Sequence, residues 1–469
     1  MESESFRDKL ATAEKDGSRI WISPTRPKGR LHSARLLVAL ILLAFFFAGP
    51  FLKINGQPML LLNILERQFV IFGLIFMPQD FHLFVLALLS FVVFIVLFTA
   101  IFGRIFCGWI CPQTVFLEMV FRKIDFWIDG NPSQQKKLAS APWGPAKLFK
   151  RIFKHGLFII LSLVICNYFM AYIIGAGRTI EIVTHSPIHH PAGFVAMMVL
   201  SLLFYGVFSW FREQACTIVC PYGRLQSVLI DSNTIVVAYD YKRGEPRGKL
   251  ASGVRSEGNG DCIDCYACLR TCPTGIDIRN GTQLECVNCT ACIDACNDIM
   301  KKSNRPSGLI RYSSESKLSG EKKKKFNGRL IIYSIILTFL LSLAIGLLGS
   351  RSIVEAIILR APGTLYFESE NDAIKNLYTV KLTNKTFKPL SVEFRLKSPA
   401  GGKLSLVGNE IVLKPEQITE TALFVDIPRQ YIFNNSIMIV IEIVVEGKVI
   451  DEITTSFMAP GKDISNAGQ

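Results

Sequence analysis

Eight of the thirteen cysteines of this chain lie within residues 262–296, in two runs that share one spacing. In each run, three cysteines at intervals of three are followed by a fourth cysteine four positions later. The first run consists of Cys262, Cys265, Cys268 and Cys272, and the second of Cys286, Cys289, Cys292 and Cys296. Pro273 follows the first run, whereas Asn297 takes that position after the second.

This spacing is typical of bacterial proteins that bind two 4Fe–4S clusters, because the first three cysteines of a run bind one cluster and the fourth binds the other. It predicts one cluster on Cys262, Cys265, Cys268 and Cys296, and a second cluster on Cys286, Cys289, Cys292 and Cys272. Structural zinc sites are the weaker interpretation, since zinc ribbons use separated pairs of cysteines rather than triplets. The missing second proline leaves the ligands unchanged, because proline is not a ligand.

Four further cysteines form a motif, Cys-x3-Cys-Pro, that occurs twice. The two copies are Cys107, Cys111 with Pro112, and Cys216, Cys220 with Pro221. On a helix, a spacing of four places both sulfurs on one face, and proline stops or bends the chain there. Two such faces would gather four soft sulfurs as a copper or other soft-metal site, a redox dithiol or a further cluster. Cys166 lies inside an apolar run, where cysteine behaves as a small hydrophobic residue.

Histidines provide a second, weaker set of candidate ligands. Three of the six lie in one short segment, at His185, His189 and His190. Neutral imidazole is a ligand for cupric ion, so these residues are secondary copper candidates, although exposed histidines usually bind nothing specific. His82 and His155 flank apolar runs and are interpreted as interfacial residues rather than haem ligands.

The elements around these residues are membrane helices. Half of the residues are hydrophobic and 19% are charged, which is unusual for a soluble protein. Five uncharged runs are near the roughly 20 residues that a helix needs to cross a bilayer. They are residues 36–52, 83–103, 156–177, 192–211 and 330–350. A further apolar piece, residues 59–77, is interrupted by Glu66 and Arg67 and is expected to lie at the interface or to re-enter.

The formal charge of +14 is concentrated before the first span, in residues 104–154 and in residues 212–329. By the positive-inside rule these parts are cytoplasmic, and the segment after the fifth span lies outside the inner membrane of a bacterium. The basic clusters are interpreted as topology signals and anionic-lipid contacts rather than as a nucleic-acid surface. All thirteen cysteines precede the last span, which places them on the reducing side.

The sequence predicts five parts. These are a mobile cytoplasmic segment (1–35), four spans with both Cys-x3-Cys-Pro motifs (36–230), a cytoplasmic cluster domain with linkers at 244–260 and 303–320 (231–328), a fifth span (329–350) and an outer domain (351–469). The cluster domain has few apolar residues, so removing iron is expected to unfold it.

Apolar and polar residues alternate in the outer domain, as in Tyr378, Val380 and Leu382, and residues 437–441 are expected to form a central strand. About seven short strands predict an immunoglobulin-like sandwich. It shows no catalytic constellation, so we expect it to contact another membrane complex. The fold class is therefore a polytopic α-helical membrane protein with a ferredoxin-like insert and a C-terminal immunoglobulin-like β-sandwich.

The order of these parts resembles the CcoG/FixG/RdxA family of cytochrome c oxidase accessory proteins over nearly the whole chain. The resemblance implies a membrane iron–sulfur protein that reduces cupric to cuprous ion during assembly of cbb3-type oxidase. It implies two 4Fe–4S clusters on the eight cysteines given above and a membrane motif at Cys107, Cys111, Cys216 and Cys220. Its implied partners are copper ion, oxidase assembly factors or subunits, and a cytoplasmic electron donor.

Two other hypotheses remain open at this point. The protein could be a quinol-linked electron-transfer subunit, since the related ferredoxin-type proteins of periplasmic nitrate and nitrous oxide reduction share paired clusters and Cys-x3-Cys-Pro. It could also be an assembly scaffold whose clusters are only structural. The outer sandwich favours the reductase.

Overall fold

The structure is a computed structural model of the chain. It describes residues 11–460 except 15, 55, 66–67, 73, 77–79, 250–257, 321–327, 351–353, 364, 370–371, 385, 387–388, 409–410, 415–417 and 446. The chain divides into two compact units, Met1–Ala344 and Ile345–Gln469. All thirteen cysteines are described, and all belong to the first unit.

Five helices of the described residues are long and apolar enough to cross a membrane, which confirms the predicted spans. They are α1 (Arg30–Ala48, continued by η1, Gly49–Phe51), α2 (Phe81–Phe102), α7 (Pro145–Ile174), α9 (Pro191–Gly206, continued by the π-helical η4, Val207–Phe211) and α15 (Gly328–Gly349). Only 11% of the apolar window of α2 is buried within the protein. A helix that is apolar on all sides and this exposed requires lipid around it.

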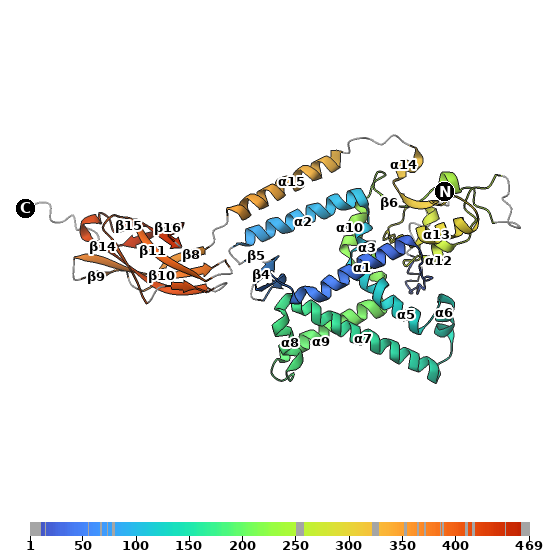
Figure 1. Cartoon of the computed structure of the whole chain (residues 1–469), viewed down its shortest axis with the longest axis horizontal. Helices are drawn as coiled ribbons and strands as arrows, with labels where there is room; N and C mark the ends of the chain where they lie inside the picture. The colour runs from blue at the N-terminus through green and yellow to red at the C-terminus, as the bar shows by residue number, and fades with distance from the viewer. Residues whose placement is uncertain are drawn as a thin grey trace, which may run out of the picture. The chain divides into compact units, whose positions relative to one another are not determined.

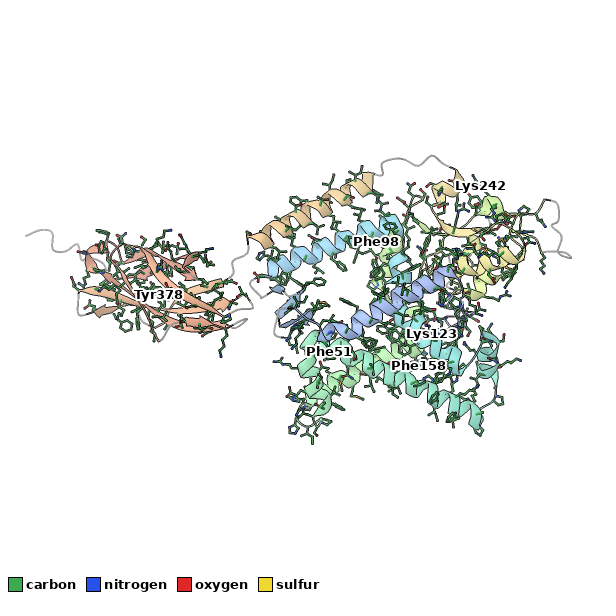
Figure 2. The ribbon with its side chains drawn as sticks, viewed as in Figure 1. Phe51, Phe98, Lys123, Phe158, Lys242 and Tyr378 are labelled. Atoms are coloured by element: carbon green, nitrogen blue, oxygen red, sulfur yellow. The ribbon has the colours of Figure 1, made fainter. Side chains whose placement is uncertain are left out.

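An aromatic core joins the helices α1, α7 and α9, which lie side by side in Figure 1. Phe121 and Phe208 stack with ring centroids 4.5 Å apart, and Phe158 meets Phe121 edge to face at 4.9 Å. Figure 2 shows Phe158 within this group of helices. Phe121 and Phe208 each lie in a π-helical turn, a feature often found at functional sites.

Short helices connect the spans at the end that carries the cysteines. They are α3 (Ile105–Trp109), α4 (Pro112–Phe116), the π-helical η3 (Leu117–Phe121), α5 (Arg122–Ile128), α6 (Pro132–Ser140), the π-helical η5 (Ala215–Val219) and α10 (Pro221–Leu229). At the other end of α7, α8 (Ala176–Thr184) leads into α9.

The described residues of 11–29 pack against the cluster domain and against Glu213 and Gln214, so the predicted mobility of the N-terminal segment is wrong for this part. The Thr25 N–H donates to the carbonyl oxygen of Arg270 at 2.8 Å, and the His32 N–H donates to Oδ2 of Asp294 at 2.7 Å. Gly29 leaves no room for a side chain, because a Cβ there would lie 2.3 Å from Cγ of Asp294. Residues 1–10 lie outside the described part.

The described part of residues 59–77 forms a small antiparallel sheet. Its strands are β3 (Leu60–Asn63), β4 (Gln68–Ile71) and β5 (Leu74–Phe76), preceded by the hairpin β1 (Lys53–Ile54) and β2 (Gln57–Pro58). Glu66 and Arg67 lie outside the described residues. The described residues do not form a spanning helix, in agreement with the expectation that this segment lies at the interface or re-enters, and aromatic and β-branched residues such as Phe69 and Val70 favour strands.

The interpretation of residues 303–320 as a linker is wrong, because they contain a strand and a helix of the cluster domain. Residues 250–257 of the other predicted linker, 244–260, lie outside the described residues. β6 (Val236–Tyr239) pairs antiparallel with β7 (Ile310–Ser313). The other elements are α11 (Tyr241–Gly244), α12 (Ala267–Thr271), η6 (Ile278–Asn280), α13 (Ala291–Lys302) and α14 (Glu315–Ser319). Val237, Met300 and Leu309 belong to a buried core around the cysteines, so the domain has more apolar packing than the sequence suggested.

The second unit is a β-sandwich, as predicted. One sheet has the order β12-β14-β10-β8, with β9 beside β10, and the other has the order β13-β11-β15-β16. The strands are β8 (Val354–Arg360), β9 (Phe367–Ser369), β10 (Ala373–Asn384), β11 (Leu390–Ser398), β12 (Lys403–Leu406), β13 (Ile411–Leu413), β14 (Ile418–Pro428), β15 (Ser436–Val445) and β16 (Lys448–Met458).

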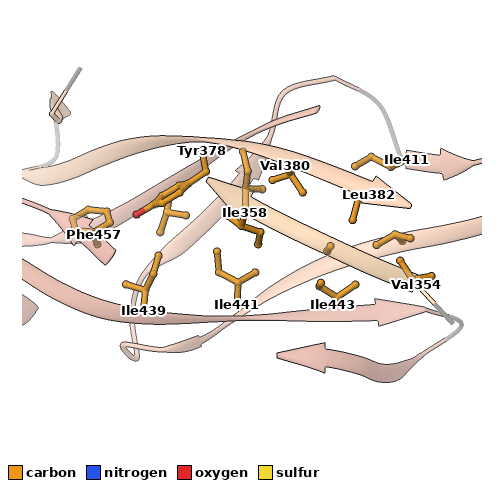
Figure 3. Packing of buried hydrophobic residues seen from close by; sticks show 14 of the residues in the cluster. Val354, Ile358, Tyr378, Val380, Leu382, Ile411, Ile439, Ile441, Ile443 and Phe457 are labelled. Carbon is orange, nitrogen blue, oxygen red and sulfur yellow. The ribbon is translucent and has the colours of Figure 1, made fainter. Parts of the chain in front are cut away.

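The core of the sandwich consists of aliphatic side chains from both sheets, packed around Tyr378 (Figure 3). The Tyr378 hydroxyl is satisfied by donating to the carbonyl oxygen of Ser456 at 2.9 Å. β15 is a central strand as expected, but its residues alternate: Ile439 and Ile441 are buried, and Met438 is exposed. One face of β15 therefore faces away from the core.

Candidate electron-transfer centre

The two cysteine runs line two separate small cavities in the cluster domain. The first cavity is bordered by Cys262, Cys265, Cys268 and Cys296. The second cavity is bordered by Cys272, Cys286, Cys289 and Cys292, with Cys268 on its wall as well. Each cavity thus collects the first three cysteines of one run and the last cysteine of the other, the combination that the spacing predicts, and Cys268 borders both cavities.

The backbone of both runs has the same unusual conformation. Asp264 and Tyr266, which flank Cys265, have positive φ angles of 53° and 56°. Asn288 and Thr290, which flank Cys289, repeat this with φ angles of 53° and 64°. Such angles are strained for residues other than glycine and cluster at ligand sites. The same strain in both copies indicates that each loop is shaped to surround a bound group.

The donor set fits two iron–sulfur clusters better than two zinc ions. Tetrahedral zinc requires four sulfurs, each about 2.3 Å from a single ion. Within the described ranges, no group of three or more Cys, His, Asp or Glu side chains is arranged to hold one metal ion. Four cysteines spread around a cavity suit a cubane cluster, in which each thiolate binds a different iron atom.

Burial controls the protonation of these thiols. It raises the pKa of Cys289 to about 11 and that of Cys286 to about 12. In the first cavity, burial likewise raises the pKa of Cys268 and of Cys296 to about 12. Free thiols would be protonated at neutral pH, so the thiolate form requires a positively charged group such as iron.

The two Cys-x3-Cys-Pro motifs meet at one place. Cys107 lies in α3 and Cys111 caps the N-terminus of α4, whereas Cys216 lies in η5 and Cys220 caps the N-terminus of α10. Cys107 Sγ donates to Oε1 of Gln226 in α10 at 3.1 Å. We call these four cysteines the thiol cluster.

Proline has a different role in these motifs from the one that the sequence suggested. Pro112 and Pro221 each occupy the first turn of a new helix, where a missing N–H costs nothing. The two cysteines of a motif therefore do not share one continuous helix face. Each motif is a helix end, a capping cysteine and a new helix.

Burial, with a smaller contribution from the neighbouring thiols, raises the pKa of Cys107 and of Cys216 to about 12. A protonated thiol is both a poor nucleophile and a poor metal ligand, so either role requires Cys107 and Cys216 to lose their protons.

The thiol cluster adjoins the second cavity. Cys107 packs against the buried group formed by Val287, Cys289 and Ala291, of which Val287 and Cys289 line this cavity. The guanidinium group of Arg104 donates to the carbonyl oxygens of Leu284 in the cluster domain and Gly223 in α10. A membrane-edge cysteine thus packs against a group of buried residues that includes a predicted iron–sulfur ligand.

Gly108 makes this close approach possible. A Cβ at position 108 would lie 2.3 Å from the carbonyl oxygen of Val287, and the Gly108 carbonyl accepts a hydrogen bond from Nε of Arg35 at 2.7 Å. The sequence gives no direct signal for this contact, although Gly108 directly follows Cys107.

We expect Gly108→Ala to separate the first motif from the cluster domain. Overpacking against backbone costs about 1–3 kcal/mol, so the variant should unfold at a lower temperature and expose the 284–288 loop to limited proteolysis. Gly156→Ala in α7 is the matched control, because a Cβ there would meet nothing within 4 Å. Equal stability and equal cleavage of the two variants would contradict the proposed contact.

A buried charge network anchors the segment that leads into the second motif. Asp125 pairs with Arg212 at 2.6 Å and with Lys154 at 2.7 Å. Glu213 pairs with Arg122 at 3.4 Å. Burial raises the pKa of Asp125, but Arg212 and Lys154 outweigh this and hold it below its usual value. Sequence reasoning missed the network, and its only signal was the charged pair Arg212-Glu213 at the end of a span.

A cavity of about 1030 Å³ lies beside this network. Its wall combines apolar side chains such as Leu202 with Asp129 and His155. The Tyr205 hydroxyl and Nδ1 of His155 are hydrogen-bonded at 2.9 Å. His155, expected as an interfacial residue, therefore borders a large amphipathic cavity.

The histidines of the outer segment do not join the thiol cluster. His190 caps the N-terminus of α9, and Cys216 follows the other end of this 21-residue span, so about 30 Å of helix separates them. Nδ1 of His185 lies 3.0 Å from the carbonyl oxygen of Glu181. Nε2 of His190 lies 3.3 Å from the carboxylate of Glu181. His189 is exposed in the same loop.

The two remaining residues of interest lie within or at the ends of spans. His82 is in the first turn of α2. Cys166 is buried in α7 beside the carbonyl oxygen of Met197, in agreement with its interpretation as a small core residue.

Three family models match the chain. A model described as a 4Fe–4S dicluster domain matches residues 211–315, and a 4Fe–4S binding domain matches residues 84–131. Together these matches contain both Cys-x3-Cys-Pro motifs and both cysteine runs. A third model, the immunoglobulin-like fold at the C-terminus of FixG, matches residues 344–460.

The relatives cover most of the chain. The protein RdxB of Cereibacter sphaeroides is 31% identical over 416 residues, which is 85% of this chain and 87% of the relative. RdxA of the same organism is 31% identical, covering 86% of this chain and 87% of its own length. The nitrogen fixation protein FixG of Rhizobium meliloti is 28% identical, and the match covers 87% of this chain and 86% of the relative.

Proposed function

The chain belongs to the FixG/RdxA family of membrane iron–sulfur electron-transfer proteins, and from this premise we propose that it reduces cupric to cuprous ion at the thiol cluster. We further propose that it does so during assembly of a cbb3-type cytochrome oxidase in the bacterial inner membrane.

One observation carries the proposal: Cys107 packs against the group of buried residues that includes Cys289. This packing places a membrane-edge thiol beside the second cavity, so the two sites are close enough for electron transfer. We assign Cys262, Cys265, Cys268 and Cys296 as ligands of a first 4Fe–4S cluster, and Cys272, Cys286, Cys289 and Cys292 as ligands of a second. When bound, these clusters supply one-electron carriers.

The thiol cluster suits copper reduction for a chemical reason. Each cupric ion takes up one electron, and the resulting cuprous ion prefers soft sulfur ligands. Binding by the sulfurs of Cys107, Cys111, Cys216 and Cys220 therefore favours the product over the substrate, although the described structure does not arrange three of these sulfurs around one ion. Arg104 and Gln226 hold the two motifs together and position these sulfurs. His185, His189 and His190, about one span length away, would serve only as an outer entry point for copper.

We propose that the cluster domain faces the cytoplasm and receives its electrons there. Lysine and arginine residues are concentrated before the first span, in residues 104–154 and in residues 212–329, and the positive-inside rule assigns such segments to the cytoplasm. The C-terminal sandwich then faces the periplasm, where it would contact oxidase assembly factors or subunits.

The proposal is tested by mixing anaerobically reduced protein with cupric ion and detecting cuprous ion with a chelating dye. We expect one cuprous ion for each electron stored. If the protein stays reduced in the presence of copper, the reductase proposal fails.

The large cavity favours a second candidate function, quinol oxidation. A volume of about 1030 Å³ can hold an isoprenoid quinol head group, and His155 hydrogen-bonded to Tyr205 could accept a proton from it. A quinol analogue should then reduce the clusters without copper, and Tyr205→Phe should slow this step. Failure of the analogue to reduce the wild-type protein would exclude this candidate. A third candidate, a scaffold with only structural clusters, predicts that serine at cluster ligands is tolerated if the protein still folds.

A further inference from the structure

A basic groove lies beside the first four-cysteine cavity. It has a volume of about 880 Å³ and runs between residues 25–31 on one side and the helices α12 and α13 on the other. Six cationic side chains line it, namely Arg26, Lys28, Arg30, Arg270, Lys301 and Lys302. Only two carboxylates lie among them, those of Asp294 and Asp298.

Both carboxylates already have partners. Asp294 is buried and accepts a hydrogen bond from the His32 N–H at 2.7 Å, and Asp298 pairs with Lys302 at 2.7 Å. The other five cations are exposed, and among the described residues none of them forms an ion pair with a carboxylate. The groove therefore presents a surplus of positive charge to the solvent, which attracts anionic surfaces.

The groove is next to the ligands of the first cluster. Its wall includes Ala267 and Arg270 of α12, the helix that carries Cys268. It also includes Ala295 and Asn297, which flank Cys296 in α13. The thiol cluster, in contrast, packs against the second cavity. The groove therefore lies beside the first cavity, where electrons would enter, and the thiol cluster lies beside the second cavity, where they would leave.

We propose that this groove docks a small, soluble, acidic one-electron carrier, which reduces the first cluster. The carrier loses one electron and the cluster held by Cys262, Cys265, Cys268 and Cys296 gains it, with no covalent bond formed and no proton transferred. This inference rests on the proposed function only in that the copper reaction needs a donor. Redox partners form small, transient interfaces that depend on complementary charge, and a basic groove above a cluster meets this requirement.

The test uses the full-length iron-loaded protein in nanodiscs of phosphatidylcholine, with bacterial flavodoxin as the probe. Arg270→Glu combined with Lys301→Glu should weaken the binding of oxidised flavodoxin about tenfold or more at low salt. Arg26→Gln combined with Lys28→Gln should weaken it less. Wild-type binding should decline as salt is raised, and the charge-reversed variant should show little salt dependence. Carbodiimide cross-linking should join flavodoxin carboxylates to Lys301 in the wild type.

Lys136→Glu combined with Lys137→Glu is the matched control, because these exposed lysines lie on α6, outside the groove. Its flavodoxin affinity should equal that of the wild type. Equal affinity in the groove variant and the control would overturn the proposal. So would a groove variant that loses binding to anionic phosphatidylglycerol vesicles but keeps flavodoxin binding, since the groove would then contact lipid.

Chemical reduction separates this proposal from the copper proposal. Reduced with dithionite, the groove variant and the wild type should produce cuprous ion at equal rates. If flavodoxin binds and reduces the wild type but copper stays oxidised, the proposed function fails and the docking site stands. If dithionite-reduced protein reduces copper but flavodoxin binding ignores the groove, the docking site fails alone.

Discussion

Replacing Cys107 and Cys216 with serine is expected to lower cupric reduction by about 100-fold or more, since a serine hydroxyl is a hard ligand that stabilises cuprous ion poorly. Both residues lie outside the two four-cysteine cavities. The iron content and the paramagnetic signal of the reduced clusters should therefore stay at the wild-type level. The measurement is the rate of cuprous ion formation after reduction with dithionite.

Cys166→Ser provides the control for this experiment, because Cys166 is a buried cysteine of the same membrane unit that lies in α7 and outside both motifs. It should reduce copper at the wild-type rate. A double variant of Cys107 and Cys216 that retains the wild-type rate would place copper reduction elsewhere in the molecule. A double variant that also loses iron would show that the thiol cluster holds iron rather than copper.

Replacing the last cysteine of either run with serine is expected to remove the iron–sulfur cluster whose other three ligands belong to the other run. Cys272 borders the cavity of Cys286, Cys289 and Cys292, so Cys272→Ser should halve the iron content, about four of eight atoms. Adding Cys286→Ser to this variant should cost no further iron, because both changes affect one cluster. Adding Cys262→Ser instead should remove nearly all iron.

Elemental analysis and paramagnetic resonance of the three variants measure this outcome, and additivity identifies which cysteines share a site. The signal of magnetic interaction between two reduced clusters should disappear in Cys272→Ser alone. If the combination with Cys262→Ser loses no more iron than Cys272→Ser, each run holds its own cluster and the crossed assignment is wrong.

The features that the sequence predicted well are local in the chain. The three-residue spacing of the cysteines determines which sulfurs can face one cavity, and the structure brings those predicted together. The spans depend on apolar runs alone, and all five are present. Alternation in Tyr378, Val380 and Leu382 identified the sandwich, since a strand with one buried face has a period of two.

The features that were missed depend on contacts between distant segments. Residues 11–29 are polar and basic, so they resemble a mobile leader, yet backbone hydrogen bonds such as that from Thr25 to Arg270 attach them to the cluster domain. Backbone contacts of this kind leave no side-chain signature. The pairing of β6 with β7 was hidden by glycine-rich neighbours, although the run Val236–Tyr239 is apolar and β-branched enough to suggest a strand.

The candidate site shows the same division. The chain positions of Cys107, Cys111, Cys216 and Cys220 predicted a shared site, whereas the packing of Cys107 against the buried group around Cys289 did not follow from any spacing. That packing requires Gly108 beside Val287 and Arg104 between two carbonyl oxygens. The sequence could have predicted a helix that begins at Pro112, because proline is favoured at the first helical position.

The central claim is that electrons stored on the eight-cysteine domain leave through the thiol cluster. Its most direct test is a single-turnover experiment in which reduced, desalted protein is mixed anaerobically with cupric ion, while the paramagnetic signal of the reduced clusters and the cuprous product are followed together. We predict that the cluster signal decays as cuprous ion appears, in equal amounts, and that both changes stop in the double serine variant of Cys107 and Cys216. Clusters that stay reduced beside cupric ion, or copper that is reduced equally fast in the double variant, would contradict the account.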